Sequence, residues 1–267
     1  MKISKFKSMI KGSIMQSIQF RMATILSIVC NLLYLVIVYY LWKAIFASST
    51  VDRINGMDFS DTMIYLVFAA SLFDFMEMWL VWNMGEDIQT GKIVVDLLKP
   101  VPYPLYSFLG SLGYCITRFF TLFMPTAVIV YFISDGGIHI GINILWFLIS
   151  AAMSLVINFY INFMVGTICM YTESIWGINI MKEVIVGLLS GSVVPIAFFP
   201  EGLKSVAMYL PFQAIINSPL ELLLHTEYGL NEIMVTLGIQ LFWLVMLHFM
   251  SNWFFNVSVR RITVNGG

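Results

Sequence analysis

Three charged side chains lie inside long apolar stretches of this 267-residue sequence. Asp74 and Glu77 stand three residues apart, on one face of a helix, and Arg118 stands in the next apolar stretch. At about 1.5 Å per residue, Glu77 and Arg118 would lie at similar depths. Because a charge at mid-membrane costs roughly 2.5–3.5 kcal/mol on insertion scales, such residues pair or face water. Two interpretations follow: an ion pair that fixes two spans, which we prefer, or a proton or cargo route.

A short charged and amphipathic segment separates these two apolar stretches. Ile93 and Leu97 share one helical face, and Pro100 ends the helix. A helix tied to two spans would pass a force on itself to both of them. The pattern predicts a docking helix for a soluble partner over 84–100, and a plain connecting loop is the alternative. The residues expected to dock are Glu86, Asp87, Gly91, Ile93, Leu97, Leu98, Lys99 and Pro100.

Small residues and a proline cluster in a later apolar stretch, at Gly187, Ser190, Gly191 and Pro195. Small residues let helices approach closely, so this stretch suits a seam between subunits or a flexing gate. An intramembrane serine hydrolase would instead need a serine activated by a histidine. Gly187 stands one position too far from Ser190 for a G-x-S-G motif, and His248 is more simply a hydrogen-bonded polar residue.

The composition is that of an integral membrane protein. Hydrophobic residues make up 60% of the chain and charged residues 11%, against about 25% charged in soluble domains. The chain is one membrane domain over 1–267, without a polar stretch long enough for a soluble catalytic module. The net charge of −1 gives no footprint for nucleic acid. The three cysteines lie in apolar stretches, so neither a disulfide nor a metal site is expected.

Hydropathy predicts an all-α membrane protein with six spans. Lys and Arg, which accumulate in cytoplasmic loops, are enriched before the first span, after the second and after the sixth. Lys182 is counted with them, between the fourth and fifth spans. Both termini are therefore predicted to be cytoplasmic. The predicted spans are 22–46, 62–83, 105–134, 142–171, 178–199 and 232–257.

Two further segments have a distinctive pattern. In the leader, 1–20, apolar residues recur every three or four positions, which predicts a helix lying on the inner leaflet; an early start of the first span is the alternative. In 200–231, Pro200, Pro211 and Pro219 divide apolar pieces too short to cross. We expect broken half-helices that dip into the outer leaflet, with an amphipathic surface loop as the alternative.

Two motifs resemble those of the ABC-2 type exporter permeases. The first has the pattern G-x-I-x-x-x-L-L-K-P and consists of Gly91, Ile93, Leu97, Leu98, Lys99 and Pro100. The second is similar to the family's pattern after span five: Ser190-Gly191, Pro195, Phe199-Pro200-Glu201-Gly202-Leu203 and Leu210-Pro211-Phe212. The six-span layout with both ends inside matches along nearly the whole chain.

This resemblance implies a permease subunit of an ATP-driven exporter in the bacterial cytoplasmic membrane. It implies a second permease, identical or homologous, and two ABC ATPase subunits as partners, within membrane lipid. The segment 86–100 would be the coupling helix and the leader an interfacial elbow helix. The cargo is not implied; abundant Phe and Met suit an amphipathic or hydrophobic compound.

ATP and Mg are expected in the partner ATPase, with no cofactor or metal bound by this chain. Between Gly85 and Gly91 there are five residues where a phosphate loop has four, and Ile93 replaces the Ser or Thr that would hold magnesium. The chain is thus predicted not to be an enzyme. The alternatives are an ion-driven transporter or channel that uses Asp74, Glu77 and Arg118, and an intramembrane hydrolase.

Overall fold

The computed structural model describes residues 3–19, 21–49, 53–134, 141–172, 175–225 and 228–261, and all regular structure in these ranges is helical. Three predicted spans are single helices: α2 (Arg21–Ser48), α8 (Asn143–Ile168) and α12 (Leu230–Val259). With the segments Phe59–Gln89 and Tyr103–Ile133, the described residues contain five helical stretches long and apolar enough to cross a bilayer. The chain is a multi-pass membrane protein.

The second predicted span, 62–83, is interrupted. It consists of α3 (Phe59–Met76) and α4 (Leu80–Gln89). Between them Glu77 leaves the helical region, with φ −60° and ψ 128°. The prediction of one continuous helix is therefore wrong at 77–79. Neither Gly nor Pro stands at the break, so its cause lies in the side chains packed around it.

The third predicted span is continuous but contains a wide turn. α6 (Tyr103–Arg118) passes through the π-helix η1 (Phe119–Phe123) into α7 (Met124–Ile133). Pro125 has no N–H to donate to the carbonyl four residues back. The turn before it widens, and the N–H of Met124 bonds to the carbonyl of Phe119, five residues back. Arg118 therefore lies directly before a distorted turn.

The fifth predicted span, 178–199, is helical only in its first part. α9 (Ile175–Leu189) has 15 residues, about 22 Å, and a short helix η2 (Ile196–Phe198) follows. This length is below the ≈ 30 Å of the hydrocarbon core. Lys182, counted above as a loop charge, lies within α9 and is largely buried. That assignment was wrong, because helix α9 starts seven residues before it.

The predicted outer segment contains α10 (Glu201–Tyr209) and α11 (Asn217–Leu224). α11 is almost entirely buried and packs against α8 and α3. Side chains satisfy the irregular backbone before it: the carbonyl of Ala214 accepts from Ser154 Oγ at 2.7 Å and from Gln240 Nε2 at 2.9 Å. Such pairing is what non-helical backbone at membrane depth requires. Residues 226 and 227 lie outside the described ranges.

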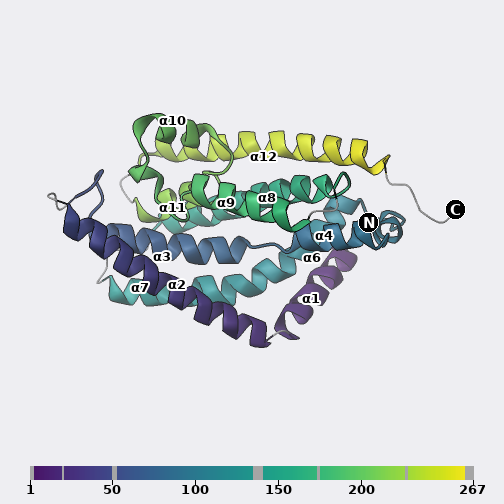
Figure 1. Cartoon of the computed structure of the whole chain (residues 1–267), viewed down its shortest axis with the longest axis horizontal. Coiled ribbons are helices and arrows are strands. Elements are labelled where there is room, and N and C mark those ends of the chain that lie inside the picture. Colours follow the sequence, from purple (N-terminus) through teal and green to yellow (C-terminus); the bar gives the residue numbers. More distant parts are fainter. Residues whose placement is uncertain are drawn as a thin grey trace.

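α5 (Ile93–Leu97) and the leader helix α1 (Ile3–Gln19) complete the chain. Figure 1 shows α1, α4 and the C-terminal end of α12 at one end of the molecule and α10 and α11 at the other. α1 packs against α6. A Cβ added at Gly113 of α6 would lie 2.5 Å from Ser13 Cβ and 2.8 Å from the carbonyl oxygen of Ile10. The small residue at 113 therefore allows the two backbones to touch.

This contact yields a matched pair of substitutions. Gly113→Ala should lower the free energy of unfolding by about 1–3 kcal/mol, since the new methyl meets backbone that must move. Gly110→Ala, one helical turn earlier, meets nothing within 4 Å and should be neutral or slightly stabilising. Thermal unfolding of the two purified variants in mild detergent measures the difference. Equal melting temperatures would contradict the close packing of α1 on α6.

Candidate functional site

Arg118 joins the second and third predicted spans at the break. Its Nη1 lies 2.7 Å from Glu77 Oε2 and donates to the backbone carbonyl of Asp74 at 3.1 Å. The guanidinium also lies over the Tyr114 ring, 4.9 Å from its centroid. Asn31 of α2 donates to the Asp74 carboxylate. The three charges predicted from the sequence thus form one cluster, with each carboxylate bonded to a donor from a different helix.

α8 supplies a further hydrogen bond to the backbone at the break. Asn158 Nδ2 donates to the carbonyl of Met76, the last residue of α3, at 2.7 Å. Asn162, one turn along α8, donates to Asn158 Oδ1 at 3.1 Å. Both asparagines are buried. A carbonyl freed by the break therefore receives a hydrogen bond that an uninterrupted helix would have supplied.

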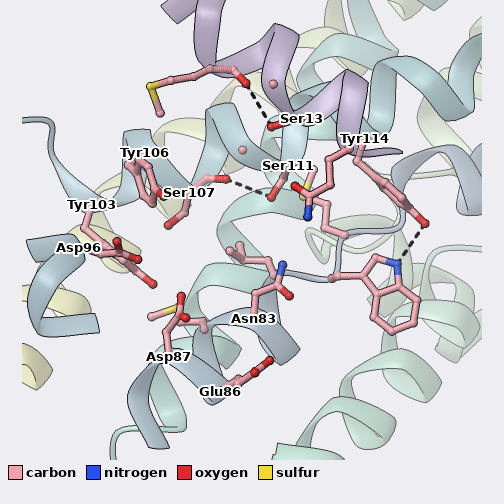
Figure 2. A pocket seen from close by; sticks show the side chains of 18 of the residues that line it. Ser13, Asn83, Glu86, Asp87, Asp96, Tyr103, Tyr106, Ser107, Ser111 and Tyr114 are labelled. Carbon is pink, nitrogen blue, oxygen red and sulfur yellow. Dashed lines mark hydrogen bonds between the residues drawn. The ribbon is translucent and has the colours of Figure 1, made fainter. Parts of the chain in front are cut away.

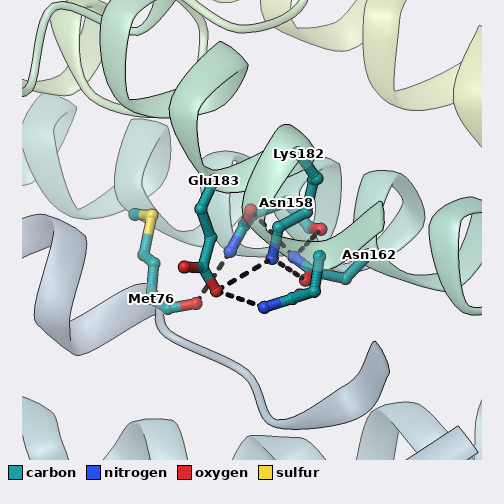
Figure 3. A network of polar contacts seen from close by, with 6 residues as sticks. Met76, Asn158, Asn162, Lys182 and Glu183 are labelled. Carbon is teal, nitrogen blue, oxygen red and sulfur yellow. Dashed lines mark hydrogen bonds and ion pairs between the residues drawn. The ribbon is translucent and has the colours of Figure 1, made fainter. Parts of the chain in front are cut away.

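α9 extends this network, as Figure 3 shows around Met76. Lys182 Nζ donates to Asn162 Oδ1 at 2.9 Å and lies 3.9 Å from Glu183 Oε1. Asn179 Nδ2 donates to Glu183 Oε1 at 2.6 Å. Sequence reasoning placed none of these α8 and α9 residues in a site. The available signal was spacing: each pair of polar residues, 158 with 162 and 179 with 183, stands four apart in an apolar stretch.

The predicted docking segment is two helices rather than one. α4 ends at Gln89, the chain turns at 90–92, and α5 follows. Gly91 has φ +74°, a conformation that favours glycine. One ion pair spans the turn, Lys92 with Asp87 at 2.7 Å, and a second lies at the end of α5, Lys99 with Asp96 at 2.5 Å. The expected single helix over 84–100 is wrong because this left-handed residue ends the helical path.

These ion pairs hold both lysines in their charged form. The hydrogen bond to Asp87 raises the pKa of Lys92 above 10.5. Hydrogen bonds to Asp96 and Tyr106 raise the pKa of Lys99 in the same direction. When folding raises the pKa of a lysine, the folded state gains stability at every pH below the ordinary lysine pKa of about 10.4. This stability is lost only as the pH rises through the raised pKa. The segment therefore keeps its ion pairs throughout the neutral range.

The docking segment exposes apolar side chains on its outer face. Leu98 is 81% exposed and Val95 62% exposed, whereas Ile93 is fully buried. Leu97 is half-buried and packs against the core. Ile93, predicted as a docking contact, therefore anchors the segment from inside and offers no surface. Val95, which the sequence analysis left out, lies on the exposed side with Leu98.

A cavity of about 810 Å³ lies behind this segment, between α1, α4 and α6. Figure 2 shows it lined by hydroxyl groups, including those of Ser107, Ser111 and Tyr114, and by carboxylates such as Glu86. It extends to Trp79 at the end of the break, whose Nε1 donates to Tyr114 Oη at 3.1 Å. A polar, water-accessible space therefore reaches from the docking segment to the interrupted span.

The small residues of the fifth predicted span lie inside the chain. Gly187, Ser190, Gly191 and Pro195 are all buried, so they do not offer an exposed seam between subunits. Gly191 has φ +84°, and a Cβ there would lie 2.7 Å from Tyr65 Oη. The close approach of α3 explains the small residue. Their burial argues against a subunit seam at these four residues, and the alternative of a flexing gate stays a prediction.

The pairing that a serine hydrolase needs is not formed among the described residues. Ser190 Oγ is buried and has no hydrogen-bond partner there. His248 Nδ1 instead lies 2.6 Å from Tyr160 Oη. In the same described ranges, no group of three His, Cys, Asp or Glu side chains is placed to hold a metal ion.

The interrupted second span, the cluster of paired charges and the exposed apolar turn belong to a polytopic membrane protein. The sequence matches the family described as ABC-2 family transporter protein over residues 13–266. The chain belongs to this family, and the predicted resemblance is confirmed. It is a membrane component of an ABC transporter, which works with ABC ATPase components. No curated protein matches the sequence.

The ion pair at the break predicts a non-additive response. Arg118→Met leaves the partly exposed Glu77 carboxylate without its counter-charge, and we expect a loss of about 1–3 kcal/mol in stability. Adding Glu77→Gln removes the stranded charge, so the double variant should be more stable than Arg118→Met alone. Thermal unfolding of the wild type, both single variants and the double variant measures this coupling. Strictly additive losses would contradict a direct ion pair.

The hydrogen bond from α8 gives a second test. Asn158→Leu leaves the carbonyl of Met76 unpaired and should cost about 1–3 kcal/mol. Asn256→Leu is the matched control, because Asn256 lies exposed on α12. Melting temperatures of the two variants in the same detergent provide the comparison. A similar small effect at both positions would mean that Asn158 does not stabilise the break.

Proposed function

We propose that this chain is the permease subunit of an ATP-driven exporter that moves an amphipathic or hydrophobic compound out across the bacterial cytoplasmic membrane. It spans the membrane six times, with both termini inside. Residues 84–100 seat in the ATPase, and the leader lies at the inner interface. The complete transporter contains two ABC ATPase subunits and a second permease, identical or homologous, and ATP and Mg are bound by the ATPase.

The observation that carries this proposal is the exposed apolar face of the docking segment. Leu98 and Val95 project from the docking segment, which two ion pairs and the buried Ile93 hold in place. Two apolar side chains exposed together, among charged residues held by ion pairs, suit a partner surface. Lys99 follows Leu98 directly in the chain, and the exposed Glu86 lies in α4; both are proposed as polar contacts.

The proposed orientation agrees with the arrangement in Figure 1. The docking segment follows α4, and α4 lies at the same end of the molecule as α1 and the C-terminal end of α12. The positive charges of the leader and of Arg260 and Arg261 then lie on the cytoplasmic side. In this arrangement α9 and the short segment after it form the fifth crossing together.

The buried charges support a structural role more than an ion route. Glu77 pairs with Arg118, and the Asp74 carboxylate accepts from Asn31. Lys182 donates to Asn162. Charges that are bonded to one another across several helices fix those helices in place, and a conducting route would need them to exchange partners. The cluster therefore serves to connect the docking segment with the spans above it.

A single substitution tests the docking surface. Leu98→Asp places a charge in the proposed contact with the ATPase while leaving the buried side of the turn intact. We expect an ATPase to co-purify with tagged wild-type chain from its native membrane in near-equal amount, and this yield to fall at least roughly tenfold in the variant. Co-elution in mild detergent, followed by mass spectrometry, measures it.

Val206→Asp is the matched control. Val206 is an exposed apolar residue of α10, at the opposite end of the molecule. The same chemical change there should leave ATPase recovery unchanged. Normal recovery in Leu98→Asp, or equal losses in both variants, would refute docking through this segment.

A further inference from the structure

A second cavity, separate from the polar cluster, lies between α6, α8 and α12. Its volume is about 610 Å³, within the roughly 300–1,000 Å³ of small-molecule sites. Leu97 of the docking segment borders it. None of its lining residues is Asp, Glu, Lys or Arg. Its walls are rich in aromatic rings, from Tyr103, Phe108, Phe159, Tyr160 and Phe255.

Three of the polar side chains that line this cavity, those of Tyr160, His248 and Asn252, contact one another. Asn252 Nδ2 donates to the carbonyl of His248 at 2.7 Å, which identifies the nitrogen of the amide. The same Asn252 nitrogen lies 3.3 Å from His248 Nδ1. Tyr160 Oη also lies close to His248 Nδ1, at 2.6 Å. An amide nitrogen can only donate, so we assign Nδ1 as the acceptor of this contact, which places the ring hydrogen on Nε2.

The Nε2–H group of His248 has no hydrogen-bond partner among the described residues. His248 is exposed, and its neighbours Val245 and Phe249 on α12 are exposed apolar residues. In a membrane protein such a surface faces lipid. A donor without a partner is costly in hydrocarbon. An occupant of the groove that supplies an acceptor would remove this cost.

We propose that this groove binds an uncharged, aromatic, lipid-soluble compound that carries a carbonyl-type acceptor and enters from the bilayer. The ligand is uncharged because no lining residue would compensate a charge. It is aromatic because the ring-lined walls favour stacked and edge-to-face contacts. Its acceptor bonds to His248 Nε2–H. Binding here requires no ATPase and is independent of the docking proposed above.

The probe is benzophenone, a photoreactive aromatic ketone, added to the purified full chain in lipid nanodiscs. After irradiation, peptide mapping should concentrate the label on the segments of α6 and α12 that line the groove. Competition uses fluorenone and fluorene, which share one shape and differ in the carbonyl. Fluorenone should suppress labelling at roughly tenfold lower concentration than fluorene, because only fluorenone accepts a hydrogen bond.

Variants assign this preference to the histidine. His248→Leu should make fluorenone and fluorene equal competitors, whereas Phe249→Leu, the next and exposed position, should keep the preference. Fluorene competing as well as fluorenone on the wild type would overturn the proposal, and this comparison needs no variant to fold. Label spread evenly over all lipid-facing helices would overturn it as well.

Discussion

The structure depends on one constraint: backbone groups inside a bilayer must find their hydrogen bonds within the protein. The break at 77–79 frees carbonyls in the middle of a span. That of Asp74 accepts from the N–H of Glu77 at 3.3 Å and from Arg118, and that of Met76 accepts from Asn158. α6 and α8 therefore supply what the interrupted helix lacks. Without these side chains a straight span would be the more stable path.

The same constraint acts at the end of the molecule that holds α10 and α11, where the chain before α11 is irregular and buried. Ser154 and Gln240 satisfy the carbonyl of Ala214, and Asn143 Nδ2 donates to that of Leu223 at 2.8 Å. Several of these residues come from α8. Five of its six buried polar residues recur at spacings of seven or four, at 143, 150, 154, 158 and 162. This stripe along one side of α8 stabilises irregular backbone both at the break and before α11.

Hydropathy was sufficient to predict the long spans, because lipid demands long apolar helices whatever their neighbours are. The similar depths expected for Glu77 and Arg118 in the membrane were also sufficient to predict that they pair. The break between them was not predictable from local sequence, since no Gly or Pro stands at 77–79 and the stabilising partners come from other helices. The polar stripe on α8 was not predicted, because uncharged asparagines and serines do not interrupt an apolar stretch. Gly91, by contrast, was an available signal of the turn.

The contacts of α4 indicate where the molecule bends. A Cβ added at Gly85 of α4 would lie 2.5 Å from Ile175 Cδ1 of α9, and one added at Gly166 of α8 would lie 2.8 Å from Met84 Sδ. α4 is therefore packed tightly against α8 and α9. A force on the docking turn would move α4 with these two helices, because close packing does not permit gradual sliding.

The connection of α4 to α3 is different, since it consists of the extended residues 77–79 and a small number of hydrogen bonds. Backbone outside a helix absorbs changes in φ and ψ that a helix resists. Relative motion is thus expected between α3 and the unit formed by α4, α8 and α9. Arg118 bonds to both Asp74 and Glu77, on the two sides of the last turn of α3, so it fixes this end of α3 against α6. If residues 84–100 dock on the ATPase as proposed, a force applied there would reach the spans through α4 and the two helices packed against it.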